Sequence, residues 1–521
     1  MNRLLLSTLI VIAFISNANA QREFGVATGN WSGTNALYLN PANIADSREK
    51  YSIDIIGLNV GADNNLGTFN SINSLIKRSF SGSSNQVTNL FNYSNNTNFN
   101  LMAPYVETRG PGFLINIKQK HTIAVTTRVR AMNQFNNFGK ALYQIITDPN
   151  TAGRNDYPVS SQNFNWTAHL WSEIGLSYGT VLLDQGRSRL KLGVTGRYLG
   201  GIGYIGLKGK NLDVFYRVSN DSLHASNSDF QYASNILSTN NAFENGLTNS
   251  TLVNALFGPK NASGYGGDIG LVYEYRTEYN ETTYDMDGRT GIVDYSKNHY
   301  KFRISAAITD MGSINYSSGN FSANVTGNGS VLGRDVAANS NNFPTFISYV
   351  RSKGFNGDSS LKSIKVYMPT ALMLSFDYHT APHVYINATY VANVADRQNF
   401  GNSWYNQLTV TPRYDKRNFS FGLPLTYSML ANNFKMGFGV RAYGFFIGSD
   451  DMFALFANNN YGFNLYFGAH VPINHKIPKD RDHDGVSDRK DRCPNDPGTW
   501  ENHGCPENDS EHGGSNDESA N

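Results

Sequence analysis

Residues 164–178 read FNWTAHLWSEIGLSY, and this stretch decides the fold class. Apolar residues recur at almost every second position from Phe164 to Tyr178, and polar residues such as Asn165 and Glu173 stand between them. A period of two places successive side chains on opposite faces of a β-strand. The alternation lasts for about 15 residues, whereas strands of soluble proteins usually have five or six. The stretch therefore predicts an unusually long strand with one apolar face.

The next stretch repeats the pattern after a short gap. Asp184-Gln185-Gly186 has the composition of a turn. The residues that follow it divide into an apolar face and a polar, largely cationic face: Leu190, Leu192, Val194 and Tyr198 on the first, and Arg189, Lys191, Thr195 and Arg197 on the second. Two long strands joined by a tight turn predict an antiparallel hairpin.

Similar alternation continues along most of the chain. Candidate strands cover 51–62, 111–118, 121–133, 164–182, 188–204, 264–278, 299–317, 367–379, 383–395, 405–415, 417–428, 434–447 and 461–473, and 210–218 is a further candidate. The total is about 14, an even number as in single-chain bacterial barrels. We expect Pro412, Pro424 and Pro472 to mark bulges, strand ends or local openings, because proline cannot donate to a sheet ladder.

Long polar excursions separate these strands. Residues rich in Asn, Ser and Gly occupy 63–110, 134–163, 219–263, 279–298 and 318–366. Apolar residues at helical spacing predict short loop helices at Ile72–Phe80 and Phe343–Val350. Short turns that alternate with long excursions, together with the strand length, favour an all-β, antiparallel transmembrane barrel over a soluble β-sandwich. The mean hydropathy of −0.40 agrees with a barrel, whose strands carry only one lipid-facing side.

The first 20 residues have the features of a secretory signal. Arg3 precedes an apolar run over 4–15, and Ala18-Asn19-Ala20 forms a small-residue cleavage site. The run is too short to cross a bilayer core of roughly 30 Å as a helix. We therefore expect cleavage after Ala20 and export to the outer membrane of a Gram-negative bacterium, where lipid surrounds the barrel.

Charge and motifs narrow the function. The formal charge is +2 and charged residues make up 16% of the chain, so nucleic acid is not an expected partner. Residues 201–206 match the glycine spacing of a dinucleotide-binding loop, but strand-like sequence follows where that motif requires a helix. With no nucleophile elbow, P-loop or zincin motif in the sequence, we predict a non-enzymatic protein.

The segment before the first strand does not alternate. It contains Asn40-Pro41-Ala42, in which Asn could cap a helical turn with Pro at its first position. In this place the motif resembles the N-terminal plug of the long-chain fatty-acid transporter family of outer-membrane barrels, and it is also similar to the barrel accessory proteins of type IX secretion. The resemblance implies that residues 21–50 form a plug in the lumen of a barrel over 51–474.

After Ile473 the sequence becomes acidic and irregular. Aspartates at 480, 482 and 484 precede Gly485, and further aspartates follow at 488 and 491. Closely spaced carboxylates on a tight turn suit calcium, which takes six to eight oxygen ligands. The pattern D-x-D-x-D-G-x-x-D-x-x-D-x-C-P resembles a thrombospondin type 3 repeat, which places a calcium module at 475–506. The resemblance implies a ligand set: Asp480, Asp482, Asp484, Asp488 and Asp491.

The two cysteines both lie in this module. In a secreted chain, Cys493 and Cys505 predict a disulfide, which stabilises a segment too small for a core. Zinc binding by this pair with His483 or His503 fits less well, since the spacing matches no common zinc site. The polar, acidic residues 507–521 are expected to be disordered, and the module is expected to face the periplasm.

Two functions remain open from the sequence. The barrel binds or passes hydrophobic small molecules through a plugged lumen, or it is a scaffold or secretion-accessory barrel that binds periplasmic or secretion-system proteins. Transport predicts an apolar pocket beside the plug, whereas a scaffold predicts a lumen closed by polar contacts. The plug resemblance places transport first.

Overall fold

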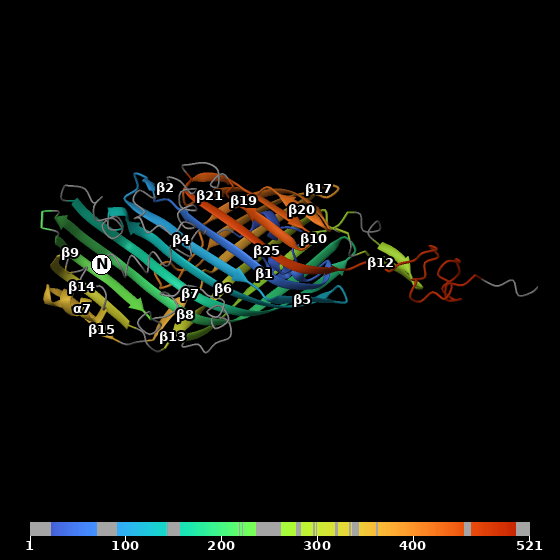
Figure 1. Ribbon diagram of the computed structural model, residues 1–521, viewed down its shortest axis with the longest axis horizontal. Coiled ribbons are helices and arrows are strands. Elements are labelled where there is room, and N and C mark those ends of the chain that lie inside the picture. Colours follow the sequence, from blue (N-terminus) through green and yellow to red (C-terminus); the bar gives the residue numbers. More distant parts are fainter. Residues whose placement is uncertain are drawn as a thin grey trace, which may run out of the picture.

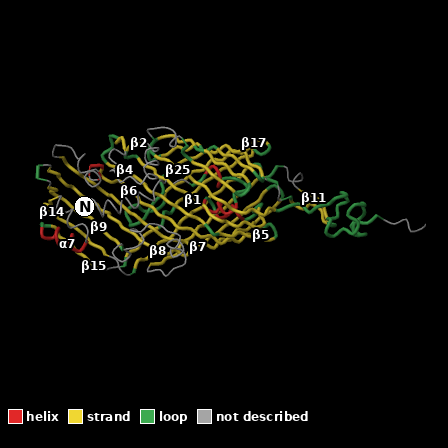
Figure 2. Tube along the Cα trace, in the orientation of Figure 1, coloured by secondary structure: helices red, strands yellow, loops and turns green. Residues whose placement is uncertain are grey.

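The computed structural model is a closed antiparallel β-barrel with 14 strand positions in its wall (Figures 1 and 2). It describes residues 22–69, 91–141, 143, 157–217, 219–220, 222–235, 262–277, 283–294, 297–298, 300–317, 321–332, 335, 343–360, 363–452 and 460–506. Strand β1 (Glu49–Asn64) pairs with β25 (Gly462–Asn474) from Tyr51↔Ile473 to Asp63↔Gly462, and this pairing closes the barrel. The predicted fold class is therefore confirmed, whereas the predicted signal peptide and tail lie outside the described residues.

Several wall positions are filled by two short strands in line. Between β1 and β25 the wall consists of β4 (Asn98–Arg109) with β5 (Gly112–Ile117), β6 (His121–Gly139), β7 (Tyr157–Gln185), β8 (Ser188–Arg217), β10 (Ala262–Tyr275), β13 (Phe302–Tyr316), β16 (Ile364–Tyr367) with β17 (Ala371–Ala381), β18 (Val384–Asn393), β19 (Gln407–Lys416), β20 (Phe419–Gly422) with β21 (Leu425–Ser428), β22 (Asn433–Met436) with β23 (Phe438–Ala442), and β24 (Phe445–Ser449).

The two ends of the barrel differ. The start of β1, the end of β25 and the short connections such as 118–120 and 443–444 lie at one end, which we call the turn end. The long connections lie at the other, the loop end. One longer connection leaves the turn end, and it carries the hairpin of β11 (Thr283–Met286) and β12 (Arg289–Val293). Beside this hairpin lies the C-terminal segment, outside the barrel (Figure 1).

The wall faces lipid with its apolar side near the turn end. On β7, Leu176 is 60% exposed and Tyr178 41%, whereas the alternating Glu173 and Ser177 are buried. Stacked outward aromatic pairs lie near the turn end: Tyr51–Phe113, His121–Tyr178, Tyr275–Phe302 and Phe376–Tyr378. Such an apolar band with aromatic residues at its edge is typical of transmembrane barrels. Among the described residues, no helix is long and apolar enough to cross a bilayer.

Nearer the loop end, β7 is buried on both faces. Phe164 is 1% exposed and packs edge-to-face on Phe138, while Asn165 on the opposite face is also 1% exposed. The alternation in 164–178 therefore correctly indicates a strand along its whole length. Its apolar face contacts lipid only in the half near the turn end.

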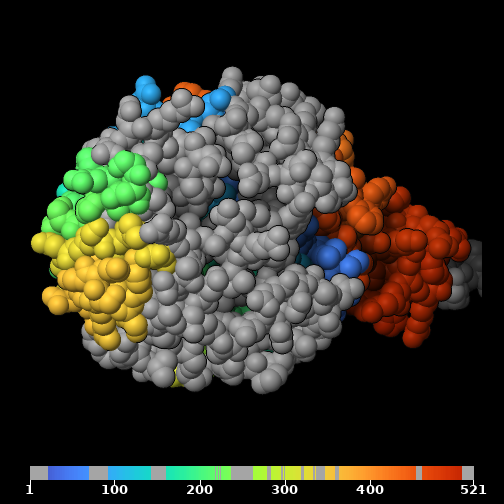
Figure 3. Space-filling view, turned by 60° about the vertical axis from the view of Figure 1, so that its left-hand side comes forward, coloured from blue at the N-terminus to red at the C-terminus, as the bar shows by residue number. Residues whose placement is uncertain are grey.

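Strand β9 (Ser222–Ser234) pairs with β8 and β14 (Phe321–Leu332), and β14 pairs with β15 (Phe355–Ser360). Helix α7 (Phe343–Ser352) packs on β14 and β15, which confirms the helix predicted at Phe343–Val350. Figure 3 shows these segments side by side at the loop end. The other predicted loop helix, Ile72–Phe80, lies outside the described residues.

Several sequence predictions about strands were wrong. The excursions 63–110, 219–263, 279–298 and 318–366 contain strands, among them β4, β9, β11, β12, β14 and β15. Residues 210–218 continue β8 instead of forming a separate strand. Residues 434–447 form a hairpin, and therefore two wall positions instead of the one predicted. The predicted total of 14 still holds, because 210–218 had been counted as a separate strand.

In β14 the buried apolar residues Ala323, Val325 and Val331 do alternate with polar ones, but Gly327 and Gly329 interrupt the apolar side. A bulge between Ala225 and Asn227 breaks the alternation in β9, and Pro104 interrupts it in β4.

The wall is irregular at the prolines, as expected. Pro424 separates β20 from β21, and its carbonyl oxygen accepts from the N–H of Gly437, which separates β22 from β23. Pro412 lies beside this break, where its carbonyl accepts from the N–H of Leu423 at 3.0 Å. Pro472 lies in β25 beyond Ala469, the last residue on β25 that β24 pairs.

Candidate functional site

The N-terminal segment, residues 22–48, contacts the inner wall on opposite sides of the lumen. Helix α2 (Phe24–Ala27) packs on β19, β20, β23 and β24. The 3-10 helix η1 (Gly33–Tyr38) packs on β1 and β5, and η2 (Pro41–Ile44) packs on β7, β8 and β10. Most of this segment is buried. It therefore crosses the lumen and is held by strands that are far apart around the barrel.

Asn40 caps η2 and fastens it to the wall. Its side-chain oxygen accepts from the N–H of Ala42 at 2.8 Å, with Pro41 at the first helical position, as the helix-start interpretation of the motif predicts. Its side-chain nitrogen donates to the carbonyl oxygens of Leu271 at 3.1 Å and Ala306 at 3.2 Å. One side chain therefore joins the helical turn to β10 and β13.

Glycines in the wall permit this close approach. A Cβ at Gly193 in β8 would lie 2.2 Å from the nitrogen of Ala42, and one at Gly270 in β10 would lie 2.1 Å from the Asn40 side-chain oxygen. On the opposite side, a Cβ at Gly439 would lie 2.5 Å from the carbonyl carbon of Gly25. These glycines were not predicted from the sequence, although glycine inside a strand signals close backbone approach.

A layer of ion pairs fills the lumen beside this segment. Asp310 of β13 lies at its centre: Arg128 Nη2 is 2.6 Å and Arg130 Nη1 is 3.1 Å from its Oδ1, and Arg22 Nη2 is 3.6 Å from its Oδ2. Glu173 accepts from Arg128 Nε at 2.6 Å. All these side chains are almost completely buried.

The layer extends around the lumen and is balanced in charge. Arg109 bridges Glu107 at 2.5 Å and Glu23 of the N-terminal segment at 2.8 Å, and Arg197 pairs with Asp268. Among the described residues, the layer has equal numbers of cations and anions: Arg22, Arg109, Arg128, Arg130 and Arg197 with Glu23, Glu107, Glu173, Asp268 and Asp310. Because buried charges are costly unless paired, the pairs of Arg22 with Asp310 and of Glu23 with Arg109 hold the N-terminal segment to this layer.

Loop 394–406, between β18 and β19, folds into the lumen from the loop end. The Asn165 side chain donates to the carbonyl oxygen of Asn399 at 2.5 Å, and the Gln134 side chain donates to that of Ser403 at 2.7 Å. Trp404 at its end donates from Nε1 to Asp310 Oδ2 at 3.3 Å. The loop is therefore bonded to β6 and β7 and reaches the ion-pair layer.

An apolar cluster lies between the N-terminal segment and this loop. The cluster includes Leu39, Leu199, Ile314 and Ile364 and is rich in methionine and aromatic residues, which are Phe24, Met102, Tyr105, Met132, Trp171, Tyr204, Tyr316, Met368, Met373, Trp404 and Tyr405. A cavity of about 10 Å³ beside Arg22, Met102 and Trp404 has space for about one water molecule. In this conformation the cluster is closely packed.

The C-terminal module contains the predicted acidic cluster. One carboxylate oxygen each from Asp480, Asp482 and Asp484 lie within 4.8 Å of one another, and Gly485 has the positive φ of 86° that the turn requires. Both oxygens of Asp482 are enclosed and meet no hydrogen-bond donor among the described residues. Enclosed carboxylate oxygens that accept no hydrogen bond are suitable ligands for a hard cation.

The two other aspartates in the motif are placed differently. Asp488 accepts from the N–H of Arg481 at 2.9 Å, and Asp491 accepts from the N–H of Cys493 at 2.7 Å. Both therefore stabilise turns around the three-aspartate cluster in this structure.

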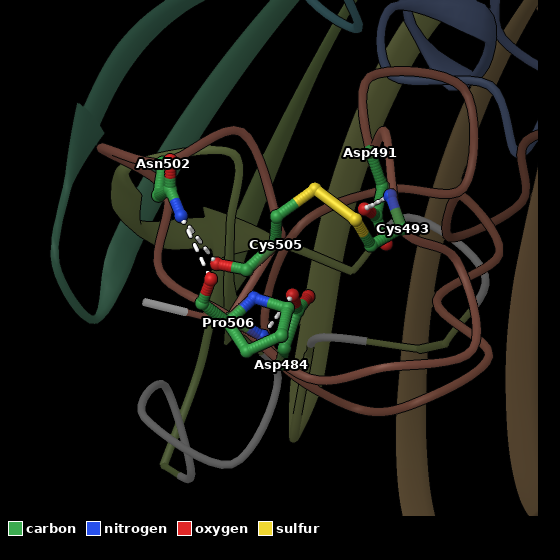
Figure 4. Close-up of a disulfide and its surroundings, with 7 residues drawn as sticks. Asp484, Asp491, Cys493, Asn502, Cys505 and Pro506 are labelled. Atoms are coloured by element: carbon green, nitrogen blue, oxygen red, sulfur yellow. Dashed lines mark hydrogen bonds between the residues drawn. A yellow bond between two sulfur atoms is a disulfide. The ribbon is translucent and has the colours of Figure 1, made fainter. Parts of the chain in front are cut away.

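The predicted disulfide joins Cys493 to Cys505, with their Cα atoms 5.0 Å apart. Next to it, the Asn502 side-chain amide donates to the carbonyl oxygens of Cys505 and Pro506 at 2.9 and 3.1 Å (Figure 4). These links fix the end of the module.

The fold and lumen define a transmembrane β-barrel whose interior is filled by an N-terminal segment and an inward loop. The chain belongs to the family of unknown function DUF5723, whose model matches residues 41–450. No curated protein matches it.

The barrel is similar to several solved structures. The Ralstonia pickettii toluene transporter TbuX is 12% identical, with 88% of this chain and 100% of that chain covered and a TM-score of 0.39. A Pseudomonas aeruginosa FadL homologue is 10% identical over 87% and 97% of the two chains, also with a TM-score of 0.39. The Escherichia coli outer membrane protease OmpT is 8% identical over 82% and 95%, with a TM-score of 0.18.

Proposed function

We propose that this protein is a non-enzymatic outer-membrane barrel that binds or passes hydrophobic small molecules through its lumen. The observation that carries the proposal is the apolar cluster between the N-terminal segment and loop 394–406. Inner faces of transmembrane barrels are usually polar, so methionine and aromatic side chains from many strands at one level of the lumen suit an apolar ligand. Methionine adapts its shape to irregular ligands.

In this proposal the N-terminal segment is a luminal plug, and the structure is its closed state. The ion-pair layer includes Arg22 and Glu23 from the segment itself. A ligand that displaces the segment must also separate these charges, which ties occupancy of the lumen to movement of the plug. The turn end, with the C-terminal module, faces the periplasm.

Mass spectrometry of the protein extracted gently from membranes tests this function. A stoichiometric apolar ligand that is lost in a Met132→Gln, Met373→Gln variant supports it. The control variant is Met429→Gln, since Met429 is 46% exposed and is not among the residues of the cluster. Wild-type protein that carries no apolar ligand, and that takes up no fluorescent fatty acid in liposomes, contradicts it.

The second candidate is a scaffold or secretion-accessory barrel. The observation that favours it is the ion-pair layer, because polar contacts close the lumen in this conformation. The sheet of β9, β14 and β15 at the loop end and the module at the turn end are then the surfaces for protein partners. Stoichiometric protein partners without an apolar ligand in the same mass-spectrometry experiment favour this function.

We further propose that the module binds Ca²⁺. The three clustered carboxylates of Asp480, Asp482 and Asp484 supply the first oxygens. Asp488 and Asp491 join them by turning their carboxylates inward. Bound calcium neutralises the cluster and rigidifies the module below the barrel.

A further inference from the structure

The hairpin of β11 and β12 reaches the C-terminal module through its turn. Asp287 and Gly288 form this turn, with φ of 57° and 72°. A turn with two positive φ values joins tightly paired strands and favours Asp-Gly. The turn therefore has a tight, defined backbone conformation at the tip of the hairpin.

Asp287 is bonded at three points to one loop of the module. Its N–H donates to the carbonyl oxygen of Gly485 at 2.8 Å, and its Oδ1 accepts from the N–H of Ser487 at 2.9 Å. Its Oδ2 lies 3.0 Å from Nζ of Lys490. Backbone groups of the loop supply two of these three contacts. The contacts of Asp287 therefore depend more on the backbone conformation of loop 485–490 than on the identity of the loop's side chains.

Gly288 makes the second part of the contact. A Cβ there would lie 2.5 Å from Nε1 of Trp500, so glycine permits the indole to pack on the turn. Lys490 Nζ lies 5.1 Å from the centre of the same ring, which links the two parts.

The loop that Asp287 binds is shaped by the acidic cluster. Asp480 accepts from the N–H of Gly485 at 3.0 Å, and Asp484 accepts from that of Val486 at 2.7 Å and that of Gly498 at 3.0 Å. Like charges this close repel unless a cation lies between them. The conformation of 485–490 therefore depends on how the charge of the cluster is neutralised.

We propose that the β11–β12 hairpin is a latch that holds the C-terminal module against the turn end only while the acidic cluster contains its cation. This inference rests on the proposed calcium site. With calcium bound, barrel and module are one rigid unit; without it, loop 485–490 relaxes, the contacts of Asp287 separate, and the module swings on residues 475–479. By linkage, the closed latch strengthens calcium binding by the same factor by which calcium closes the latch.

Hydrogen exchange of the full-length protein in micelles tests the latch. Peptides covering 283–293 and 484–492 are followed with calcium and with a chelator. We expect the amides of both peptides to exchange roughly tenfold faster in chelator, a factor within the usual range of coupling between sites. Exchange in β1 and β25 should stay the same.

Two glycine variants separate the latch from the hairpin itself. Gly288→Ala introduces a Cβ against Trp500, whereas Gly291→Ala introduces one at a similar φ of 68° with no atom within 4 Å. We expect Gly288→Ala, with calcium present, to raise exchange in 484–492 and to weaken calcium binding several-fold. Gly291→Ala should change neither. Asp287→Ala, which removes both side-chain contacts to the module at a turn position that also has a positive φ, should match Gly288→Ala.

The outcomes distinguish the two proposals. If peptide 484–492 responds to calcium but peptide 283–293 does not, the cation site is right and the latch is overturned. If neither peptide responds and titration detects no calcium binding, the cation site fails, and the conditional latch fails with it. Equal effects of Gly288→Ala and Gly291→Ala also overturn the latch, because hairpin strain then explains both.

Discussion

The guanidinium carbon of Arg22 lies 4.4 Å from the centre of the Trp404 ring, so the N-terminal segment meets the inward loop within the lumen. Trp404 also packs edge-to-face on Tyr105 of β4 and donates to Asp310. Trp404, which belongs to the inward loop, thus contacts both the N-terminal segment and the barrel wall. We expect the closure of the lumen to depend on these contacts of Trp404.

Trp404→Ala should loosen the closure. Truncating a buried aromatic side chain costs about 3–5 kcal/mol, and here it also frees Arg22 to leave its stack. We expect higher single-channel conductance in planar bilayers and a lower melting temperature. Phe434→Ala is the control, because Phe434 is 82% exposed on the wall. Equal conductance of the two variants would show that the loop does not seal the lumen.

Asp310→Ala should destabilise the barrel strongly. Arg22, Arg128 and Arg130 all approach this carboxylate, and removing it leaves cations together in a buried layer. Breaking a buried ion pair costs about 3–5 kcal/mol. Urea unfolding in detergent measures the loss. Asp213→Ala, which removes only a bond to the exposed Ser160, should change the unfolding free energy little.

Gly193→Ala should displace the Asn40-Pro41-Ala42 turn. The added Cβ would meet the backbone of Ala42, which cannot move as a flexible side chain would. Overpacking of this kind costs about 1–3 kcal/mol. We expect faster protease cleavage within 22–48. Gly196→Ala lies in the same strand with open space around it and should leave cleavage unchanged; similar cleavage in both variants contradicts the contact.

Removing calcium, or changing Asp482 and Asp484 to Asn, should loosen residues 478–506 while the barrel stays intact. The physical reason is that the remaining carboxylates lose the cation that neutralises them. Limited proteolysis followed by mass spectrometry measures the effect. Asp496→Asn, at an exposed position outside the cluster, serves as the control. Unchanged protease resistance after chelation refutes the calcium site.

The sequence alone determined the barrel, most of its strands and the disulfide. Period-two alternation is a local property, because it follows from the geometry of a single strand, and 164–178 shows it without reference to any partner. The Asn-Pro pair likewise specifies its own helical turn, since capping involves residues two positions apart. The disulfide was predictable because only two cysteines exist and both lie in one short module.

Only the tertiary structure decided how the lumen is filled. Arg22 and Trp404 are far apart in the sequence, and no periodic pattern relates them. The same holds for Asp287 and Ser487, which meet because the hairpin and the module leave the same end of the barrel. β9 and β14 were missed for a related reason: a bulge in β9, and Gly327 and Gly329 in β14, interrupt the alternation, so pairing with neighbouring strands and packing against helix α7 define them.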